Sequence, residues 1–537
     1  MLQNSGGIWP GLTTLLLESS PVTTITYEGD NNSEDNVLDL KGLITSDGAS
    51  TDFSIKYNTK VSSIKNLTYT GQLKELFKGC LSLTNFTATK LCSNHESAQS
   101  IFEDCPALTS ILGITFSETE RRITKNLEYA FAIYVKNTSG SLSADNEKSG
   151  IKNIIKNLPG VWYFNSMFVN NLRDTKETLD LDDFFAANNP DDDDTKNNIR
   201  YPDTSSSRLG LVNTFYNTQC KIDIPSTFLN SVRAGSYIRP AFYGADGLKS
   251  IDKDWMINHC FSSFDSMYRR LKTSFDINGA LQACINAATK STSKYYQSNQ
   301  QVQYMNYMFA DTNANSTINS ETLKQFFQAY PNVREINNMF SNNSKLTTLP
   351  DSLFDSNTSL SKVTSAFEAS GIRSVGNIFS NSSTKYPNLT SLGSLFASCA
   401  SLTSIHDKLF NNVTSVTSLS SCFIDCTGLE SISASALSTL KNLTQLKNTW
   451  QHCENLKFKY NNDDGTTTIS GKIPIDFFAN NENLKNMSSC FSNCYQIYFS
   501  TTETSETIAT FLPSNVEDVT SLFAVCTGLS NGNSSIH

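Results

Sequence analysis

The sequence predicts an α/β repeat fold: a solenoid in which coils of about 27 residues stack lengthwise. Three observations predict it. A short phrase returns along the chain, in which an apolar residue is followed four positions later by an aromatic residue and then, at steps of three, by Cys and Leu. Degenerate copies keep the same apolar frame between the clear ones. The spacing between successive aromatic residues is nearly constant.

The copies of the phrase extend along most of the chain. The clear ones are Leu73-Phe77-Cys80-Leu83-Phe86, Phe102-Cys105-Leu108-Ile111, Phe396-Cys399-Leu402-Ile405, Phe423-Cys426-Leu429-Ile432 and Phe523-Cys526-Leu529. The degenerate ones include Phe242-Ala245-Leu248-Ile251, Phe340-Asn343-Leu346-Leu349, Trp450-Cys453-Leu456 and Phe491-Cys494-Ile497. We therefore predict that the repeat covers residues 61–530.

The aromatic residue of each copy, here called the anchor, sets the repeat length. Anchors at 340, 367, 396, 423 and 450 are 27, 29, 27 and 27 residues apart. A single coil of this length cannot bury its own apolar stripe, so neighbouring coils must stack and share a core. We expect the Phe, Cys and Leu of the phrase to point into that core.

A second phrase, about halfway between anchors, places Pro or an acidic residue before an aromatic one. It occurs at 182–185, 225–228, 350–354, 407–410 and 474–478. The segments that follow, such as 412–416 and 442–446, alternate and carry β-branched or apolar residues, which predicts half-buried strands. Each coil would then have two corners and two walls.

The thirteen cysteines invite a disulfide interpretation. Seven of them, however, occupy the position three residues after an anchor, here called the slot: Cys80, Cys105, Cys399, Cys426, Cys453, Cys494 and Cys526. Beside core leucines, Cys behaves as a small buried hydrophobe. The odd total also leaves at least one cysteine unpaired. We predict reduced core cysteines rather than a disulfide framework.

Several segments depart from the repeat. Residues 1–60 contain strand-like runs and are predicted to form a β-rich cap or attachment segment, because a solenoid needs its open end covered. Insertions are predicted near 137–150, 186–207, 272–302 and 459–472, and 531–537 form a tail. Within the third insertion, 279–288 predict a short helix. The second and fourth are polar and loop-like. Such insertions often gather on a binding face.

The sequence contains only weak signals for a catalytic or metal-binding site. The run Asp191 to Asp194 could hold calcium, but no glycine turn or distal Glu completes the loop, so a solvated loop is favoured. The pairs Cys422/Cys426 and Cys490/Cys494 have helical spacing for zinc, yet Cys422 and Cys490 fill apolar positions of the repeat. The pair His452-Cys453 lacks an orienting group in the sequence. No phosphate loop is present. We predict no enzyme, no cofactor and no metal site.

Surface tyrosines of the middle region could stack on sugar rings or anchor a protein interface, with core packing as the alternative. They are Tyr201, Tyr237, Tyr243, Tyr295 and Tyr296.

Composition limits the function class and the location. Charged residues are 17% of the chain and the net charge is −9, without a clustered basic stripe, which argues against a nucleic-acid partner. No run reaches the length of a membrane span, and the first residues lack the features of a signal peptide. We expect a protein that works outside cells without ordinary export, which a virus particle released by lysis would explain.

The repeat phrase resembles that of BspA-like leucine-rich-repeat proteins, over about four fifths of the chain. The resemblance implies a leucine-rich-repeat solenoid and a surface or adhesive role, and related repeats occur in viruses of gut bacteria. The expected function is a non-catalytic virion component, a tail fibre or tail-associated protein that attaches to the host or decorates the particle. Its partners would be virion proteins, through the N-terminal segment, and a host surface protein or glycan. Whether the chain forms a homo-oligomer stays open.

Two alternatives to the virion role stay open. The first is a bacterial or protozoan cell-surface adhesin. The second is a sugar-cleaving or metal-dependent enzyme, which requires paired carboxylates inside a groove.

Overall fold

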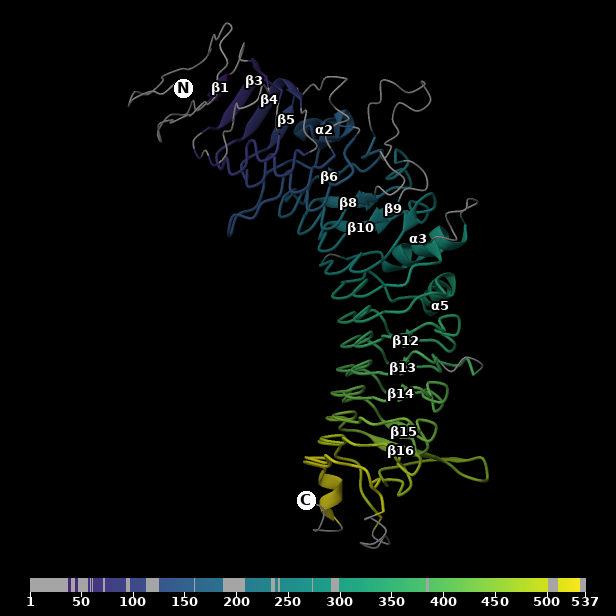
Figure 1. Cartoon of the computed structure of the whole chain (residues 1–537). Helices are drawn as coiled ribbons and strands as arrows, with labels where there is room; N and C mark the ends of the chain where they lie inside the picture. The colour runs from purple at the N-terminus through teal and green to yellow at the C-terminus, as the bar shows by residue number, and fades with distance from the viewer. Residues whose placement is uncertain are drawn as a thin grey trace. The chain divides into compact units, whose positions relative to one another are not determined.

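A computed structural model describes the larger part of the chain (Figure 1). The described residues are 37–39, 44–46, 57, 59, 61–70, 73–92, 97–112, 125–158, 160–186, 208–232, 237–239, 242–272, 274–290, 299–382, 386–500 and 510–531. The chain packs as two units, residues 1–261 with 270–273 and residues 262–269 with 274–537. Each unit is a solenoid of stacked coils.

The strands of the first unit form three parallel sheets, in which the strands of neighbouring coils lie side by side. One sheet has the order β1 (Val37–Asp39), β3 (Ser63–Thr70), β4 (Asn85–Cys92), β5 (Ser110–Leu112), with β2 (Ile44–Ser46) also on β3. A second contains β10 (Leu248–Ile251), β8 (Lys221–Ile224) and β6 (Thr178–Leu179). The third contains β11 (Cys260–Phe261), β9 (Tyr237–Arg239) and β7 (Arg208–Gly210). Parallel pairing follows because every coil winds in the same direction.

The second unit contains one six-stranded sheet. Its order is β12 (Thr348–Leu349), β13 (Ser374–Val375), β14 (Ser404–Ile405), β15 (Ser431–Ser433), β16 (Lys457–Asn461) and β17 (Thr467–Ser470). The first five strands are parallel, and β17 pairs antiparallel with β16. The described chain ends in the 3-10 helix η1 (Thr527–Asn531).

Short helices lie at the edges of some coils. In the first unit α1 (Asn146–Ser149) and α2 (Ile151–Asn157) follow one another, and Lys148 and Lys152 bind Glu177 and Asp180 at 2.8 Å. In the second unit α3 (Ile277–Thr289) packs against α5 (Ser320–Ala329). Asp276 caps α3 by accepting a bond from the Gly279 amide. The predicted helix at 279–288 is therefore confirmed.

The anchors form a ladder of stacked rings in each unit. In the first unit Phe77, Phe102, Phe131, Phe168, Phe215 and Phe242 lie 5.1, 5.8, 5.7, 6.0 and 5.8 Å apart between ring centroids. In the second, Tyr268, Phe309, Phe340, Phe367, Phe396 and Phe423 stack in the same way, as do Trp450, Phe491 and Phe523. The predicted repeat solenoid is confirmed, including the degenerate copies in the middle of the chain.

The residues of the phrase lie in the core as a set. Phe77, Cys80, Leu83, Phe102, Cys105, Leu108, Phe396, Cys399, Leu402, Phe423, Cys426, Leu429, Trp450, Cys453, Phe491, Cys494 and Cys526 are all buried. Phe523, on the last described coil, is half-buried.

The turn around each anchor has a repeated backbone conformation that the sequence analysis did not anticipate. The residue two before the anchor has positive φ in every coil in which the structure describes it, as Ser421 does at 57°, and the residue two after usually does, as Asp425 does at 59°. The amides of Ser421, Phe423 and Asp425 all donate to the next coil, at 2.8, 2.9 and 2.9 Å. The alternating conformation thus turns every second amide toward the neighbouring coil.

Two secondary-structure predictions are wrong. Residues 412–416 form a turn rather than a strand, and 442–446 contain only an isolated parallel bridge at Gln445. The strands β14 and β15 lie just after the core leucines Leu402 and Leu429. The buried residues Val413, Val416 and Leu419 recur every three positions, whereas a half-buried strand alternates every two. The predicted loop at 459–472 is instead the β16–β17 hairpin, closed by Gly465 with φ of +79°.

The segment predicted as a β-rich cap supplies β1 and β2, which extend the first sheet in parallel. Tyr57 has φ of 62°, and its amide donates to the Lys78 carbonyl at 2.6 Å. This is the bond that the residue two after an anchor makes in other coils. The coil-to-coil pattern is therefore present before residue 61, where the repeat was predicted to begin.

Candidate binding surface

The slot cysteines act as buried hydrogen-bond donors. The Sγ atoms of Cys399, Cys426, Cys453 and Cys494 each lie 3.1 Å from the anchor carbonyl of the preceding coil. Cys105 and Cys526 make the same contact at 3.0 and 2.9 Å. Where the slot holds Asn171 or Thr312, the side chain donates to the corresponding carbonyl, at 2.8 and 2.6 Å. In these coils the slot holds a small donor, and Cys is not there only as an apolar filler, whereas Ala245 and Leu271 occupy the slot after Phe242 and Tyr268 without a donor.

The state of the thiols bears on the disulfide and metal alternatives. The twelve cysteines whose side chains are described are free and buried. Burial raises the pKa of the Cys422, Cys426, Cys490 and Cys494 thiols well above the ordinary range. A zinc ligand must be a thiolate, which such an environment disfavours. Within the described ranges no group of three or more His, Cys, Asp or Glu side chains is arranged to hold a metal ion.

The sequence neighbours His452 and Cys453 point to different partners. The Cys453 thiol donates to the Phe423 carbonyl in the core, while His452 Nδ1 lies 2.6 Å from Asp425 Oδ1 at the surface. The pair therefore lacks the contact that a nucleophile and its base require.

One wall of the second unit presents an uncharged polar surface over three adjacent coils, which we call the neutral face. It consists of Thr390, Ser391, Thr417, Ser418, Ser420, Thr444 and Gln445. Ser391, Ser418 and Gln445 form consecutive parallel bridges. Ion pairs flank it on both sides, Lys362 with Glu335 at 2.9 Å and Lys485 with Glu517 at 3.4 Å. Lys447 lies at its edge.

Hydrogen bonds orient the hydroxyls of the neutral face. Thr417 Oγ1 donates to the Thr390 carbonyl at 3.1 Å, and Thr444 Oγ1 donates to the Thr417 carbonyl at 3.0 Å. Their protons are therefore used within the wall, and their lone pairs stay available as acceptors. The same acceptor recurs at one coil spacing, which suits a polymer with a repeating hydroxylated unit.

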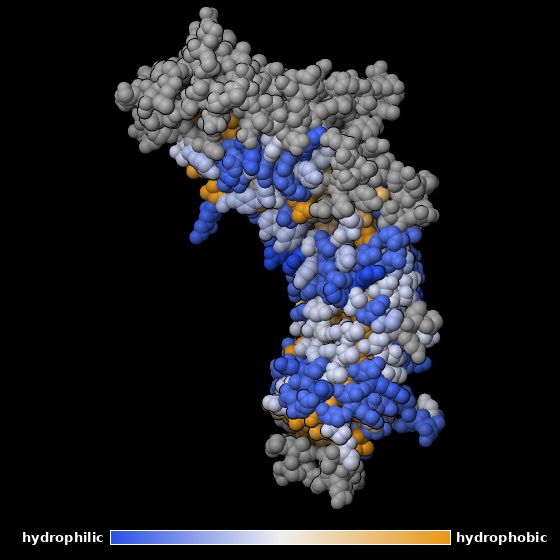
Figure 2. Space-filling view, viewed as in Figure 1, coloured by the Kyte–Doolittle hydropathy of each residue, from blue (hydrophilic) through white to orange (hydrophobic). Residues whose placement is uncertain are grey.

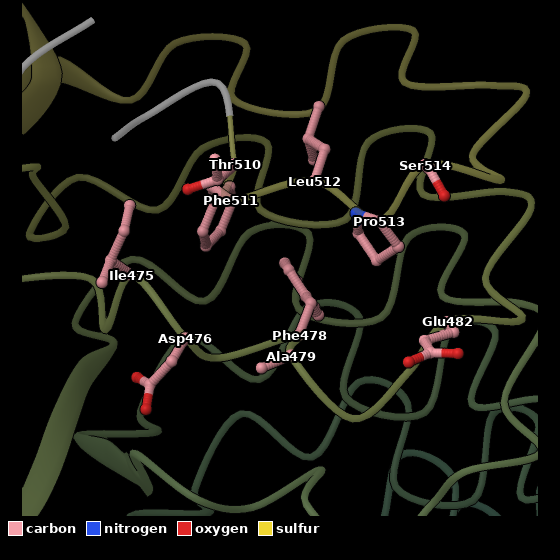
Figure 3. A pocket seen from close by; sticks show the side chains of 10 residues that line it. All are labelled: Ile475, Asp476, Phe478, Ala479, Glu482, Thr510, Phe511, Leu512, Pro513 and Ser514. Carbon is pink, nitrogen blue, oxygen red and sulfur yellow. The ribbon is translucent and has the colours of Figure 1, made fainter. Parts of the chain in front are cut away.

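A hollow of about 430 Å³ lies in the C-terminal part of the second unit (Figure 3). It is lined by Ile475, Asp476, Phe478, Ala479, Glu482, Thr510, Phe511, Leu512, Pro513 and Ser514. The Phe478 and Phe511 rings, 5.0 Å apart between centroids, are almost fully buried. The Asp476 and Glu482 side chains are exposed.

The two carboxylates bear on the enzyme alternative. A glycosidase holds one of its two carboxylic acids in an apolar, desolvated environment so that it can donate a proton. Neither Asp476 nor Glu482 is buried. Neither side chain therefore has the desolvated environment that such an acid requires.

Other sequence-predicted features separate into three groups. Tyr243 is half-buried, and its ring stacks on the Tyr216 ring with 5.1 Å between centroids. Its Oη accepts a hydrogen bond from Arg270 Nη1 at 3.2 Å.

Asn412 and Asn442, which begin glycosylation triplets, donate their side-chain amides to carbonyls of the preceding coil, which supports a structural role. Outside the described residues or side chains lie Asp191 to Asp194, Tyr201, Tyr237, Tyr295 and Tyr296.

Sequence reasoning missed both the neutral face and the hollow. The face could have been found from the Thr and Ser that recur five and six positions before the anchors 396 and 423. The two walls of the hollow, 475–482 and 510–514, stand at equivalent positions of neighbouring coils, because Phe478 and Phe511 lie 13 and 12 residues before the anchors 491 and 523. The concavity between the walls has no signal in the sequence.

Comparisons with known proteins add little to this description. No family model matches the sequence, and no curated protein matches it significantly. Among solved structures, the crystal structure of the TLR13-ssRNA13 complex is similar at 10% sequence identity and a TM-score of 0.16, over 83% of this chain and 82% of that chain. So weak a likeness carries no argument about function. Among the described residues, no helix has the length and apolar character to cross a membrane.

Proposed function

We propose that this chain is a non-catalytic binding protein of the BspA-like leucine-rich-repeat kind that uses the neutral face to hold a neutral glycan. The observation that carries the proposal is the run of three coils in which the outward residues of this wall, except Lys447, are hydroxyl and amide groups, with ion pairs at the flanks. Removing an uncharged hydroxyl from water costs less free energy than removing an ion. A neutral ligand can therefore displace water from this wall with a small desolvation penalty.

Repetition compensates for the weakness of each contact. A single neutral hydrogen bond contributes only about 0.5–1.5 kcal/mol net. A polysaccharide that meets the same groups on successive coils gains the benefit of linked contacts without a deep pocket. An acidic polymer would find no cation on the face except Lys447 at its edge.

The test uses immobilised neutral and acidic polysaccharides with the purified full chain. Ser418→Glu places a charge at the centre of the face and should weaken binding to a neutral polysaccharide by about tenfold or more. Ser404→Glu makes the same change on β14, an exposed strand of the other wall, and should leave binding unchanged. Equal losses in both variants, or no binding to any neutral polysaccharide, would contradict the proposal.

The biological setting we propose is a phage particle, as a tail fibre or tail-associated attachment protein, with the cell-surface adhesin as the alternative. The proposal rests on the repeat phrase and the scarcity of charged residues. Mass spectrometry of purified particles, compared with washed host-cell envelopes, distinguishes them. Peptides of this chain that co-purify with particles through a density gradient support the virion, and peptides found only in envelopes support the adhesin.

A further inference from the structure

The hollow of the second unit combines an apolar floor with concavity. The rings of Phe478 and Phe511 form its floor and are almost fully covered, at 1% and 3% exposure. The half-buried side chains of Ile475, Leu512 and Pro513 supply its accessible apolar surface (Figure 3). Orange, apolar side chains also gather on these C-terminal coils in Figure 2. The volume of about 430 Å³ falls within the range of roughly 300–1,000 Å³ typical of ligand sites.

Two carboxylates flank this floor. Asp476 and Glu482 lie on either side of Phe478 along one segment (Figure 3), and neither forms an ion pair with a Lys or Arg of the described residues. The neighbouring Lys485 is engaged with Glu517 at 3.4 Å. Both side chains are exposed, so they can meet a cation without first losing their own hydration.

We propose that the hollow is a docking site for a protein segment in which Arg or Lys stands beside an aliphatic or aromatic residue. The apolar neighbour packs on Ile475, Leu512 and Pro513, and the cationic head reaches Asp476 or Glu482 while its aliphatic stem lies along the apolar wall. This inference concerns a different surface from the neutral face and does not depend on the glycan proposal.

Charge complementarity selects this occupant among the alternatives. An acidic segment would be repelled by both carboxylates. A neutral sugar would not cover the apolar lining of the hollow with apolar groups of its own. A second copy of the chain would have to bring its own exposed basic and apolar residues, which makes self-association a distinguishable outcome of the experiment.

The experiment follows the methyl NMR signals of Ile475 and Leu512, which line the hollow, in the deuterated full-length chain. The probes are two capped dipeptides, acetyl-Leu-Arg-amide and acetyl-Leu-Glu-amide. We expect the arginine peptide to shift both methyl signals saturably and the glutamate peptide to leave them in place. The apparent affinity of the arginine peptide should fall as salt is added, because the contact is partly screened.

Paired variants separate charge from fold. Asp476→Asn with Glu482→Gln keeps the shape of the hollow and should weaken the arginine peptide about tenfold. Glu454→Gln with Asp463→Asn removes the same charge from exposed positions that do not line the hollow, and should leave the affinity unchanged.

Three results would overturn the proposal. They are equal shifts with both peptides, equal weakening by both variant pairs, and no shift at millimolar peptide. Concentration-dependent shifts without any peptide would assign the hollow to self-association instead. Loss of glycan binding in Ser418→Glu leaves this experiment unaffected, so the two proposals fail independently.

Discussion

The slot residue completes the hydrogen bonding of an anchor carbonyl. The Phe396 carbonyl accepts the Cys399 amide of its own coil at 3.2 Å and the Cys426 thiol of the next coil at 3.1 Å. A carbonyl oxygen has two lone pairs, so the thiol fills the second. The same role is filled by Asn171 and Thr312 in their coils, whereas the slots that hold Ala245 and Leu271 lack a side-chain donor.

Substitution of Cys426 tests the donor role. Cys426→Ser keeps a donor and Cys426→Ala removes it, so Ala should lower the free energy of unfolding by about 0.5–1.5 kcal/mol more than Ser does. Urea denaturation of the two variants measures the difference. If Ser proves more destabilising than Ala, the slot is merely apolar, as the sequence alone had indicated.

His259 should make the free energy of unfolding of the first unit depend on pH. Its ring is buried, Nε2 contacts the Leu229 carbonyl at 3.1 Å, and burial lowers the pKa to about 4. Between about pH 6.5 and about pH 4 the unfolded chain therefore binds a proton that the folded chain does not. The free energy of unfolding should fall as the pH falls through this window, by up to about 3 kcal/mol.

The His259→Gln variant removes this titration and serves as the comparison. Urea denaturation at about pH 7 and about pH 5 should show a smaller loss for the variant than for the wild type. Equal losses in the two proteins would mean that carboxylates alone cause the pH dependence.

At the scale of elements, two different periods explain which predictions succeeded. A helix such as α3 shows its 3.6-residue period directly in the sequence 277–289, and it was predicted. The turn-rich segments have a period of three, which resembles a strand pattern over five residues, and 412–416 was misassigned for that reason. The hairpin at 459–472 was read as polar and loop-like, although its Thr run is β-branched and supplies β17.

The hairpin offers a prediction confined to one element. Gly465 has φ of +79°, and a Cβ there would meet no atom within 4 Å. Gly465→Val should therefore cost about 1 kcal/mol or more through backbone strain alone. Amide exchange of Thr467–Ser470 should speed up while the anchor amides stay protected. Faster exchange at the anchors of neighbouring coils would show that the hairpin also holds the solenoid together.

At the scale of the whole molecule, thiol burial reports on the stacked core. The twelve described cysteines are buried in coils of both units, among thirteen in the chain. Burial keeps these thiols protonated and inaccessible, so at most one should react per native chain, and about thirteen should react after denaturation. A chromogenic thiol reagent measures both numbers. Several fast-reacting thiols in the native protein would contradict a closed core.

The sequence by itself determined the repeat, its length and the inward side chains, because each coil must bury the same apolar stripe against its neighbours. The tertiary structure alone decided where the strands lie, that slot thiols bond to carbonyls, and that every second amide of the anchor turn points to the next coil. It also decided the neutral face and the hollow. These depend on how the side chains of neighbouring coils pack. The repeat places Phe478 and Phe511 on adjacent coils, but nothing in the sequence shows that a hollow opens beside them.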